Sequence, residues 1–246
     1  MAEGDIPSPG STLMYFVLVS MGFLFFILFN INKSKSKEAV DSAKNSNIIN
    51  FIYMLFIVIG SFFLNVHNSR QICSNNIEWN YILLITLVPW IVIFVLLYFI
   101  LNLFPGWVSP FSNTIGYVFV SMLGVASVLK KILNSDPDPN SIELVKAINT
   151  INNNKSKFIN QIDIDLTNFD KFIVDLKTSK IAKSSDDETI LQLYKLITIK
   201  HVIGKLVWYI LSGVLITSIS YNLIIGMSCK KSVEQIIKDY NTANPV

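Results

Sequence analysis

The feature that most constrains this chain is a run of 25 residues, 80–104, that contains no charged side chain. The hydrocarbon core of a bilayer is about 30 Å thick, and about 20 apolar residues in an α-helix are enough to cross it. The run is therefore predicted to be a membrane-spanning helix. Pro89 lies inside it and is expected to kink the helix, because proline removes one backbone hydrogen bond.

Three further uncharged runs have the length of a membrane span, and they cover residues 12–31, 48–66 and 206–228. The composition points the same way, because 52% of the 246 residues are hydrophobic and only 15% are charged. Soluble domains carry about 25% charged residues. The predicted fold is all-α and polytopic, with four membrane-spanning helices and one polar helical module.

A fifth uncharged run, residues 111–129, has two interpretations. Its 19 residues are long enough to cross a membrane, but it is rich in the small and polar residues that favour close helix packing. Lys130 and Lys131 follow directly, and a crossing would place them on the non-cytoplasmic side, against the usual distribution of lysine. We therefore favour a re-entrant or interfacial hairpin over a fifth span.

The loops indicate an orientation. Residues 32–47 hold four lysines and two acidic residues, which predicts a cytoplasmic loop, whereas residues 67–78 hold one arginine and no lysine. Cys73 and Cys229 form neither a CxxC motif nor a metal-ligand spacing, so two free thiols are favoured over a disulfide. Without a fifth span the two cysteines lie on the same, non-cytoplasmic side, and with one they lie on opposite sides.

The polar module is expected at residues 134–200, where the asparagines at 152–154 are expected to interrupt its helices. Ser185 and Glu188 have the spacing of a capping box, so a helix is predicted to begin there. Two apolar stripes at helical spacing are predicted to face each other, or a partner, in a helical hairpin. The shorter stripe consists of Ile190, Leu193 and Ile197. The longer one, a candidate helix–helix stripe with heptad-like spacing, consists of Ile159, Ile162, Leu166, Phe169, Ile173 and Leu176.

The predicted domains are therefore an N-terminal membrane domain (1–133), the polar module (134–200) and a C-terminal span with a short amphipathic tail (201–246). None of them carries a recognisable catalytic motif. The four predicted spans contain no Asp, Glu, Lys, Arg or His, on which membrane enzymes and proton-coupled transporters depend.

His67 and His201 lie at membrane boundaries, with no partner at the spacing of a metal site or a catalytic triad. The net charge of +3 is too small to indicate nucleic-acid binding. The sequence therefore predicts a protein that is not an enzyme, has no cofactor and no metal, and does not bind nucleic acid.

The most distinctive segment is an aromatic-rich turn between the third span and the fifth run. Two prolines fix the backbone, one glycine frees it, and the aromatic side chains suit the headgroup level of a membrane. The segment is either a tight interfacial connection or a rigid elbow that docks a partner. The residues of this candidate docking elbow are Pro105, Gly106, Trp107, Pro110, Phe111, Asn113 and Tyr117.

The segment FPGWVSPFSNTIGY at residues 104–117 resembles a small family of multi-span proteins of nucleocytoplasmic large DNA viruses, of the phycodnavirus-like and mimivirus-like kind. The resemblance covers about residues 79–129. It implies a minor capsid-type protein of the virion inner membrane, which derives from host endoplasmic reticulum during assembly. The implied partners are the lipid bilayer, capsid or other virion proteins, and further copies of the chain, and no active-site residue is implied.

Two other functions remain open. A channel or transport-like protein predicts a water-filled path lined by serine, threonine and asparagine. A fusion-associated protein predicts that the loop carrying Cys73 is exposed on the outer surface and that this cysteine forms a disulfide.

Overall fold

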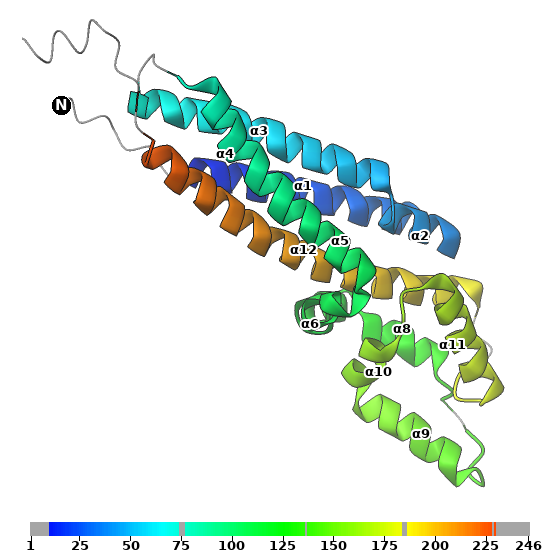
Figure 1. Cartoon of the computed structure of the whole chain (residues 1–246). Coiled ribbons are helices and arrows are strands. Elements are labelled where there is room, and N and C mark those ends of the chain that lie inside the picture. The colour runs from blue at the N-terminus through cyan, green and yellow to red at the C-terminus, as the bar shows by residue number, and fades with distance from the viewer. Residues whose placement is uncertain (1–9, 74–76, 136, 184–185, 228, 230–246) are drawn as a thin grey trace, which may run out of the picture. The chain divides into compact units, whose positions relative to one another are not determined.

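The computed structural model describes residues 10–73, 77–135, 137–183, 186–227 and 229 (Figure 1). The regular structure of these residues is helical, and the only β-type pairing among them is an isolated bridge between Leu133 and Ala182. The expected N-terminal lead (1–9) and the amphipathic part of the tail (233–237) lie outside the described residues.

Four helical stretches of the described chain are long and apolar enough to cross a membrane. They are α1 (Gly10–Lys33), α2 (Lys37–Lys44) with α3 (Asn47–Cys73), α4 (Trp79–Pro89) through α5 (Leu96–Leu103), and α12 (Asp187–Ile225). The prediction of an all-α, polytopic membrane protein is confirmed.

The chain forms two compact units. Unit 1 consists of Met1–Met21, Ile49–Ile100 and Tyr209–Val246, and unit 2 consists of Gly22–Ile48 and Leu101–Trp208. Three consecutive domains were expected from the sequence, but α1, α3, α5 and α12 each contribute residues to both units.

Unit 1 is a bundle of the four apolar helices. Tyr53 of α3 shares a hydrogen bond of 2.8 Å with Ser20 of α1, and the Phe16 ring of α1 lies 5.6 Å from that of Trp90. Many large apolar side chains on these helices point outward, which suits contact with lipid. They include Phe51, Phe56, Phe63, Leu84, Val92, Leu96 and Phe99.

The third span changes its winding after Pro89. This residue ends α4, and a π-helical segment, Trp90–Val95, connects it to α5. Proline lacks the N–H group that an α-helix would direct to the carbonyl four residues earlier, which belongs to Ile85. The Ser220 hydroxyl of α12 donates to this carbonyl at 3.1 Å. A neighbouring helix thus supplies the hydrogen bond that Pro89 cannot.

Unit 2 is built around the first half of α12, whose residues 196–204 are all buried. The shorter helices of this unit include α8 (Val125–Ile132), α9 (Ile142–Asn153), α10 (Lys155–Gln161) and α11 (Leu166–Thr178). The interruption expected at 152–154 occurs where α9 ends. Beside the Leu133–Ala182 bridge, the Asn134 N–H donates to the Ile181 carbonyl at 2.8 Å. These backbone contacts join the segment that follows α8 to the segment that follows α11.

The N-terminal cap of α12 differs from the predicted one. The Asp186 carboxylate accepts a hydrogen bond from the Thr189 N–H at 3.3 Å, so Asp186 takes the cap position. Ser185, which was predicted to hold this position, lies outside the described residues.

Candidate functional site

The predicted docking elbow is helical along its whole length. It contains a 3₁₀ turn (Pro105–Val108), α6 (Ser109–Phe111), a π-helical segment (Ser112–Gly116) and the start of α7 (Tyr117–Met122). Both prolines lie in the first turn of their segments, where the missing N–H group is not needed. Four elbow residues are exposed and three are half-buried. The exposed ones are Pro105, Gly106, Trp107 and Pro110, and the half-buried ones are Phe111, Asn113 and Tyr117.

The inner side of the elbow packs on α12 through Trp208. The indole N–H of Trp208 donates to the Trp107 carbonyl at 2.7 Å, and the two indole rings lie 6.2 Å apart. The Phe111 ring meets the same indole edge-on at 5.1 Å. Aromatic pairs contribute about 0.5–1.5 kcal/mol beyond the area that they bury. The elbow therefore docks on the chain's own helix, and only its outer side is free for a partner.

A buried lysine fixes the other end of the elbow. Lys200 is 3% exposed, and its ammonium donates to the side-chain oxygens of Asn113, at 2.9 Å, and Asn160, at 3.1 Å. The Asn160 amide in turn donates to the Asn113 carbonyl at 3.1 Å. Burial lowers the pKa of Lys200 to about 8, because loss of hydration disfavours the charged ammonium. This triangle joins the elbow, α10 and α12.

Two glycines allow the close approach of the elbow to α12. A Cβ atom at Gly204 would lie 2.7 Å from the Ser112 backbone nitrogen, and one at Gly116 would overlap the Lys200 carbonyl oxygen. Lys200, Gly204 and Trp208 are spaced by four residues, so they lie on one face of α12. Their spacing is visible in the sequence, but a site at these three residues was not predicted from it.

The hairpin after the elbow is sharply bent. The helical segments Pro105–Met122 and Val125–Ile132 meet at 83°, and Gly124 between them has φ +88°, which only glycine adopts readily. By length and composition the pair is either a broken span or a re-entrant loop.

The candidate helix–helix stripe is divided between two helices. Ile159 lies in α10, Ile162 in the connection, and the other four residues in α11. Five of the six side chains are buried, and Leu166 is half-buried. Phe169 lies 4.8 Å from the Tyr194 ring of α12, so the stripe faces the helix that carries the second stripe. The stripe does not lie on one continuous helix, because a new helix begins after Asp165. The Asp165 carboxylate caps α11 by accepting from the Asn168 N–H at 3.1 Å.

The two cysteines are joined. Cys73, the last residue of α3, and Cys229, which follows α12, form a disulfide with a Cα–Cα distance of 5.3 Å. The interpretation as two free thiols, favoured from the sequence, is therefore wrong. Spacing along the chain could not show this, because the two residues are 156 positions apart.

Unit 1 also contains a column of buried polar side chains that the sequence analysis did not identify. On α3, Ser61, Asn65 and Ser69 follow each other at intervals of four residues, and each is at most 1% exposed. The Asn65 amide donates to the Thr86 hydroxyl of α4 at 2.8 Å. The Ser61 and Ser69 hydroxyls have no hydrogen-bond partner within the described chain.

His67 and His201 differ in burial. His67 is exposed, with its ring 3.3 Å from the Gln71 amide. His201 is 7% exposed, and burial together with nearby lysines, Lys205 first among them, lowers its pKa to about 3. Its imidazole is therefore neutral at physiological pH. Within the described ranges, no group of three or more His, Cys, Asp or Glu side chains could hold a metal ion.

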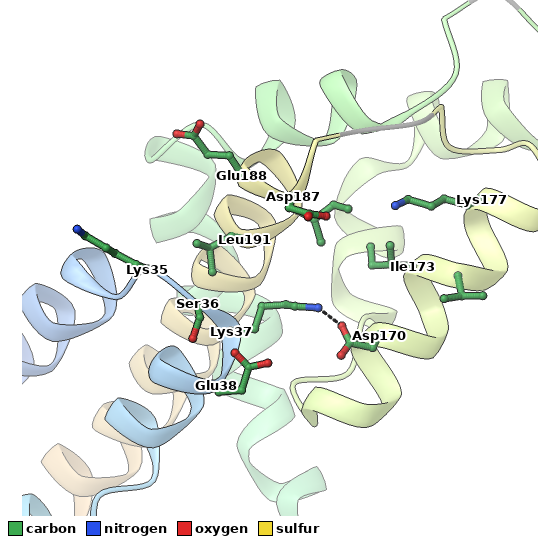
Figure 2. A pocket seen from close by; sticks show the side chains of 12 residues that line it. Lys35, Ser36, Lys37, Glu38, Asp170, Ile173, Lys177, Asp187, Glu188 and Leu191 are labelled. Atoms are coloured by element: carbon green, nitrogen blue, oxygen red, sulfur yellow. Dashed lines mark hydrogen bonds and ion pairs between the residues drawn. The ribbon is translucent and has the colours of Figure 1, made fainter.

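An open groove of about 660 Å³ lies in unit 2 between the start of α2, α11 and the start of α12 (Figure 2). Its floor is apolar and includes Ile173 and Leu191, and its rim carries both signs of charge. Lys37 and Asp170 form an ion pair across it. The groove therefore combines an apolar floor with a rim of mixed charge.

Comparison with models of known protein families, with curated proteins and with solved structures finds no match.

Proposed function

We propose that this chain is a structural membrane protein that anchors a protein layer to a bilayer, and that it is not an enzyme. The observation that carries the proposal is the continuity of α12, which joins a charged first half to a charge-free second half that begins at Leu206. At 1.5 Å per residue, its 39 residues rise about 58 Å, and the charge-free part rises about 30 Å. One helix is thus both the core of unit 2 and a membrane anchor.

The proposed topology has four spans. Cys73 and Cys229 are paired, so the chain between them crosses the membrane an even number of times. The α4–α5 stretch and α12 account for two crossings, which leaves none for the bent helix pair at 105–132. Disulfides form in oxidising compartments, so the cysteines belong on the non-cytoplasmic side and the lysine-rich loop on the cytoplasmic side. Both inferences agree with the orientation expected from the loops.

In this topology the polar module (134–200) and the loop 32–47 are on the cytoplasmic side, and the groove that both of them line offers a surface to a partner. Lys35, Lys177 and Glu38 line the groove in addition to the Lys37–Asp170 pair, so charges of both signs are available for a specific contact. Such charges mainly determine which partner binds, while the apolar floor contributes affinity. The module is the part of the chain best suited to hold a protein layer.

We further propose, on the resemblance of the elbow, that the bilayer is the inner membrane of a large DNA virus and that the protein layer is its icosahedral capsid. A membrane derived from host endoplasmic reticulum keeps its cytoplasmic side toward the assembling shell. The polar module would then face capsid proteins, and copies of the chain could contact one another in the membrane.

The proposal is tested by fractionating purified virus particles that carry the chain. The particles are treated with a mild non-ionic detergent, and the chain is quantified by mass spectrometry in the shell and lipid fractions. Retention with the shell, together with amine cross-links from Lys35 or Lys177 to capsid proteins, is the expected result. Release with the lipid would contradict a link to the capsid, and absence from particles would contradict the virion assignment.

A channel is the second candidate, and the buried polar column of α3 is the observation that favours it. The unpartnered hydroxyls of Ser61 and Ser69 could be hydrated, as in a narrow water-filled path. Ion flux into vesicles that contain the purified chain, with loss of flux in an Asn65→Leu variant, would favour this function. Vesicles that remain tight would exclude it.

The fusion-associated alternative is favoured by the disulfide at Cys73, which it requires. Mixing of lipids between vesicles that carry the chain and plain target vesicles would support it. If lipids mix no faster than between protein-free vesicles, this alternative is wrong.

A further inference from the structure

Two predicted membrane boundaries meet in one contact of unit 2. The uncharged run 80–104 ends two residues after Asn102, and the uncharged run 206–228 begins directly after Lys205. The Lys205 ammonium donates to the Asn102 side-chain oxygen at 3.3 Å. Both ends lie at the depth at which lysine side chains reach lipid headgroups.

Aromatic residues mark the same depth. Trp107 follows the end of the third span, and Trp208 lies one turn into the last charge-free run, with the two rings 6.2 Å apart. Tryptophan is enriched at the headgroup level of membranes because its ring is apolar and its N–H group is polar. The Lys205–Asn102 contact and this tryptophan pair therefore define one interfacial layer.

Within the described ranges the salt bridges are Lys37–Asp170 and Lys44–Asp41, and neither involves Lys205. The Lys205 ammonium donates instead to the neutral amide of Asn102. Lys205 is half-buried, and a partly dehydrated cation is stabilised when an anion joins it. A phosphate group at headgroup depth would be such an anion.

The chain that follows Asn102, the contact partner of Lys205, carries many exposed apolar side chains. Side chains from the end of the third span, the elbow and α7 are about half exposed or more, and a soluble protein would rarely leave so many on one segment. They are Leu103 at 70%, Phe104 at 57%, Trp107 at 52%, Val118 at 60% and Met122 at 82%. The apolar spans carry large exposed side chains of the same kind, so acyl chains are the occupant that suits this segment.

We propose that Lys205 and Asn102 bind the phosphate of an anionic phospholipid in the cytoplasmic leaflet, while its acyl chains cover the exposed apolar side chains of the elbow. A free phosphate compound shares the headgroup chemistry but would leave Leu103, Phe104 and Trp107 in water. The site gives the elbow a lipid-binding role on its outer side, in addition to its attachment to α12, and it does not depend on the capsid assignment.

The test uses the full-length chain in a neutral detergent and native mass spectrometry with three probes: phosphatidylglycerol, phosphatidylcholine and inorganic phosphate. The chain is expected to bind phosphatidylglycerol more tightly than phosphatidylcholine. Lys205→Gln should weaken phosphatidylglycerol binding about fivefold, the contribution of one lysine near an anionic surface. Lys205→Arg should retain the binding, and so should the matched control Lys130→Gln, which removes an exposed lysine of α8.

Asn102→Asp provides a second variant at an exposed position, where folding should be unaffected. The added carboxylate would pair with Lys205, so the preference for phosphatidylglycerol should disappear. Equal binding of the two lipids by the unmodified chain, or unchanged binding in both the Lys205→Gln and Asn102→Asp variants, would overturn the proposal. Full competition by millimolar inorganic phosphate would assign the site to a soluble phosphate compound and contradict the lipid.

Discussion

Replacing Ser220 with alanine should destabilise unit 1 because it leaves one buried backbone carbonyl without a donor. Pro89 cannot supply an N–H group to the Ile85 carbonyl, and the Ser220 hydroxyl, 3.1 Å away, takes its place. Ser220 is 2% exposed, so water has little access to the carbonyl once the hydroxyl is removed. The loss of stability is determined mainly by the unpaired Ile85 carbonyl and less by the small volume of the hydroxyl that is removed.

The expected loss is about 1–2 kcal/mol in the free energy of unfolding. A buried polar group left without a partner costs about 1–3 kcal/mol, and hydrogen bonds between membrane helices reach about 1.7 kcal/mol in double-mutant cycles. The matched control is Ser218→Ala. The Ser218 hydroxyl is exposed and donates to the Val214 carbonyl of its own helix at 2.7 Å, so its loss should change the stability by less than about 0.5 kcal/mol.

The decisive assay is a double-mutant cycle with Pro89→Ala. Alanine restores the N–H group, so Ser220→Ala should cost less than about 0.5 kcal/mol in the Pro89→Ala background, and the coupling energy should be about 1 kcal/mol. The unfolding of the four chains in mixed micelles is followed by tryptophan fluorescence with the disulfide intact. If Ser220→Ala costs the same with and without Pro89, the hydroxyl does not compensate for the proline and the reasoning is wrong.

Three further predictions concern the disulfide, Lys200 and the close helix contact. An impermeant maleimide should not label the intact chain in sealed vesicles, and after reduction it should label both cysteines from one side; labelling from opposite sides would contradict four spans. Burial lowers the pKa of Lys200 to about 8 from 10.5, so the unfolded chain binds more protons between these values and stability should rise with pH there. Denaturant titrations should show a weaker rise for Lys200→Met, and an unchanged rise would refute the assignment. Gly204→Ala should destabilise unit 2 by about 1–3 kcal/mol, whereas Gly22→Ala, with no atom within 4 Å of the new Cβ, should change stability by less than about 1 kcal/mol; equal effects in thermal unfolding would contradict the close contact.

The spans could be predicted from the sequence because they depend on composition over a window rather than on any contact. A charged group inside a bilayer is expensive, so uncharged runs of about 20 residues stand out against loops that carry lysine. The buried amide of Asn65 escaped notice for the same reason, since it carries no charge and does not break the run. The interval of four residues that relates it to Ser61 and Ser69 was present in the sequence, but only the neighbouring Thr86 gives it a partner.

The candidate helix–helix stripe shows that the sequence can predict which side chains are buried without predicting whether they lie on one helix or two. Its spacing of three and four residues correctly indicated which side chains would be buried, since the same face is presented by one helix or by two in succession. Asp163 and Asp165 compete with helical hydrogen bonding, because short acidic side chains bond to nearby backbone N–H groups. That local competition, and not the apolar pattern, decides that α10 and α11 are separate helices.

The orientation of the elbow could not be obtained from its own residues, because both of its sides carry aromatic side chains. One face of α12 determines which side of the elbow packs inward. Along it, a lysine, a glycine and a tryptophan follow at intervals of four residues, as Lys200, Gly204 and Trp208. Each of them fits a different partner. The lysine ammonium is satisfied by amide oxygens, the glycine allows a neighbouring backbone to approach closely, and the indole N–H is satisfied by a carbonyl. The elbow meets all three with Asn113, Ser112 and Trp107. A segment that satisfies three unlike requirements along one helix face has little freedom to rotate, so its remaining apolar side chains are held outward, where lipid or a partner can reach them.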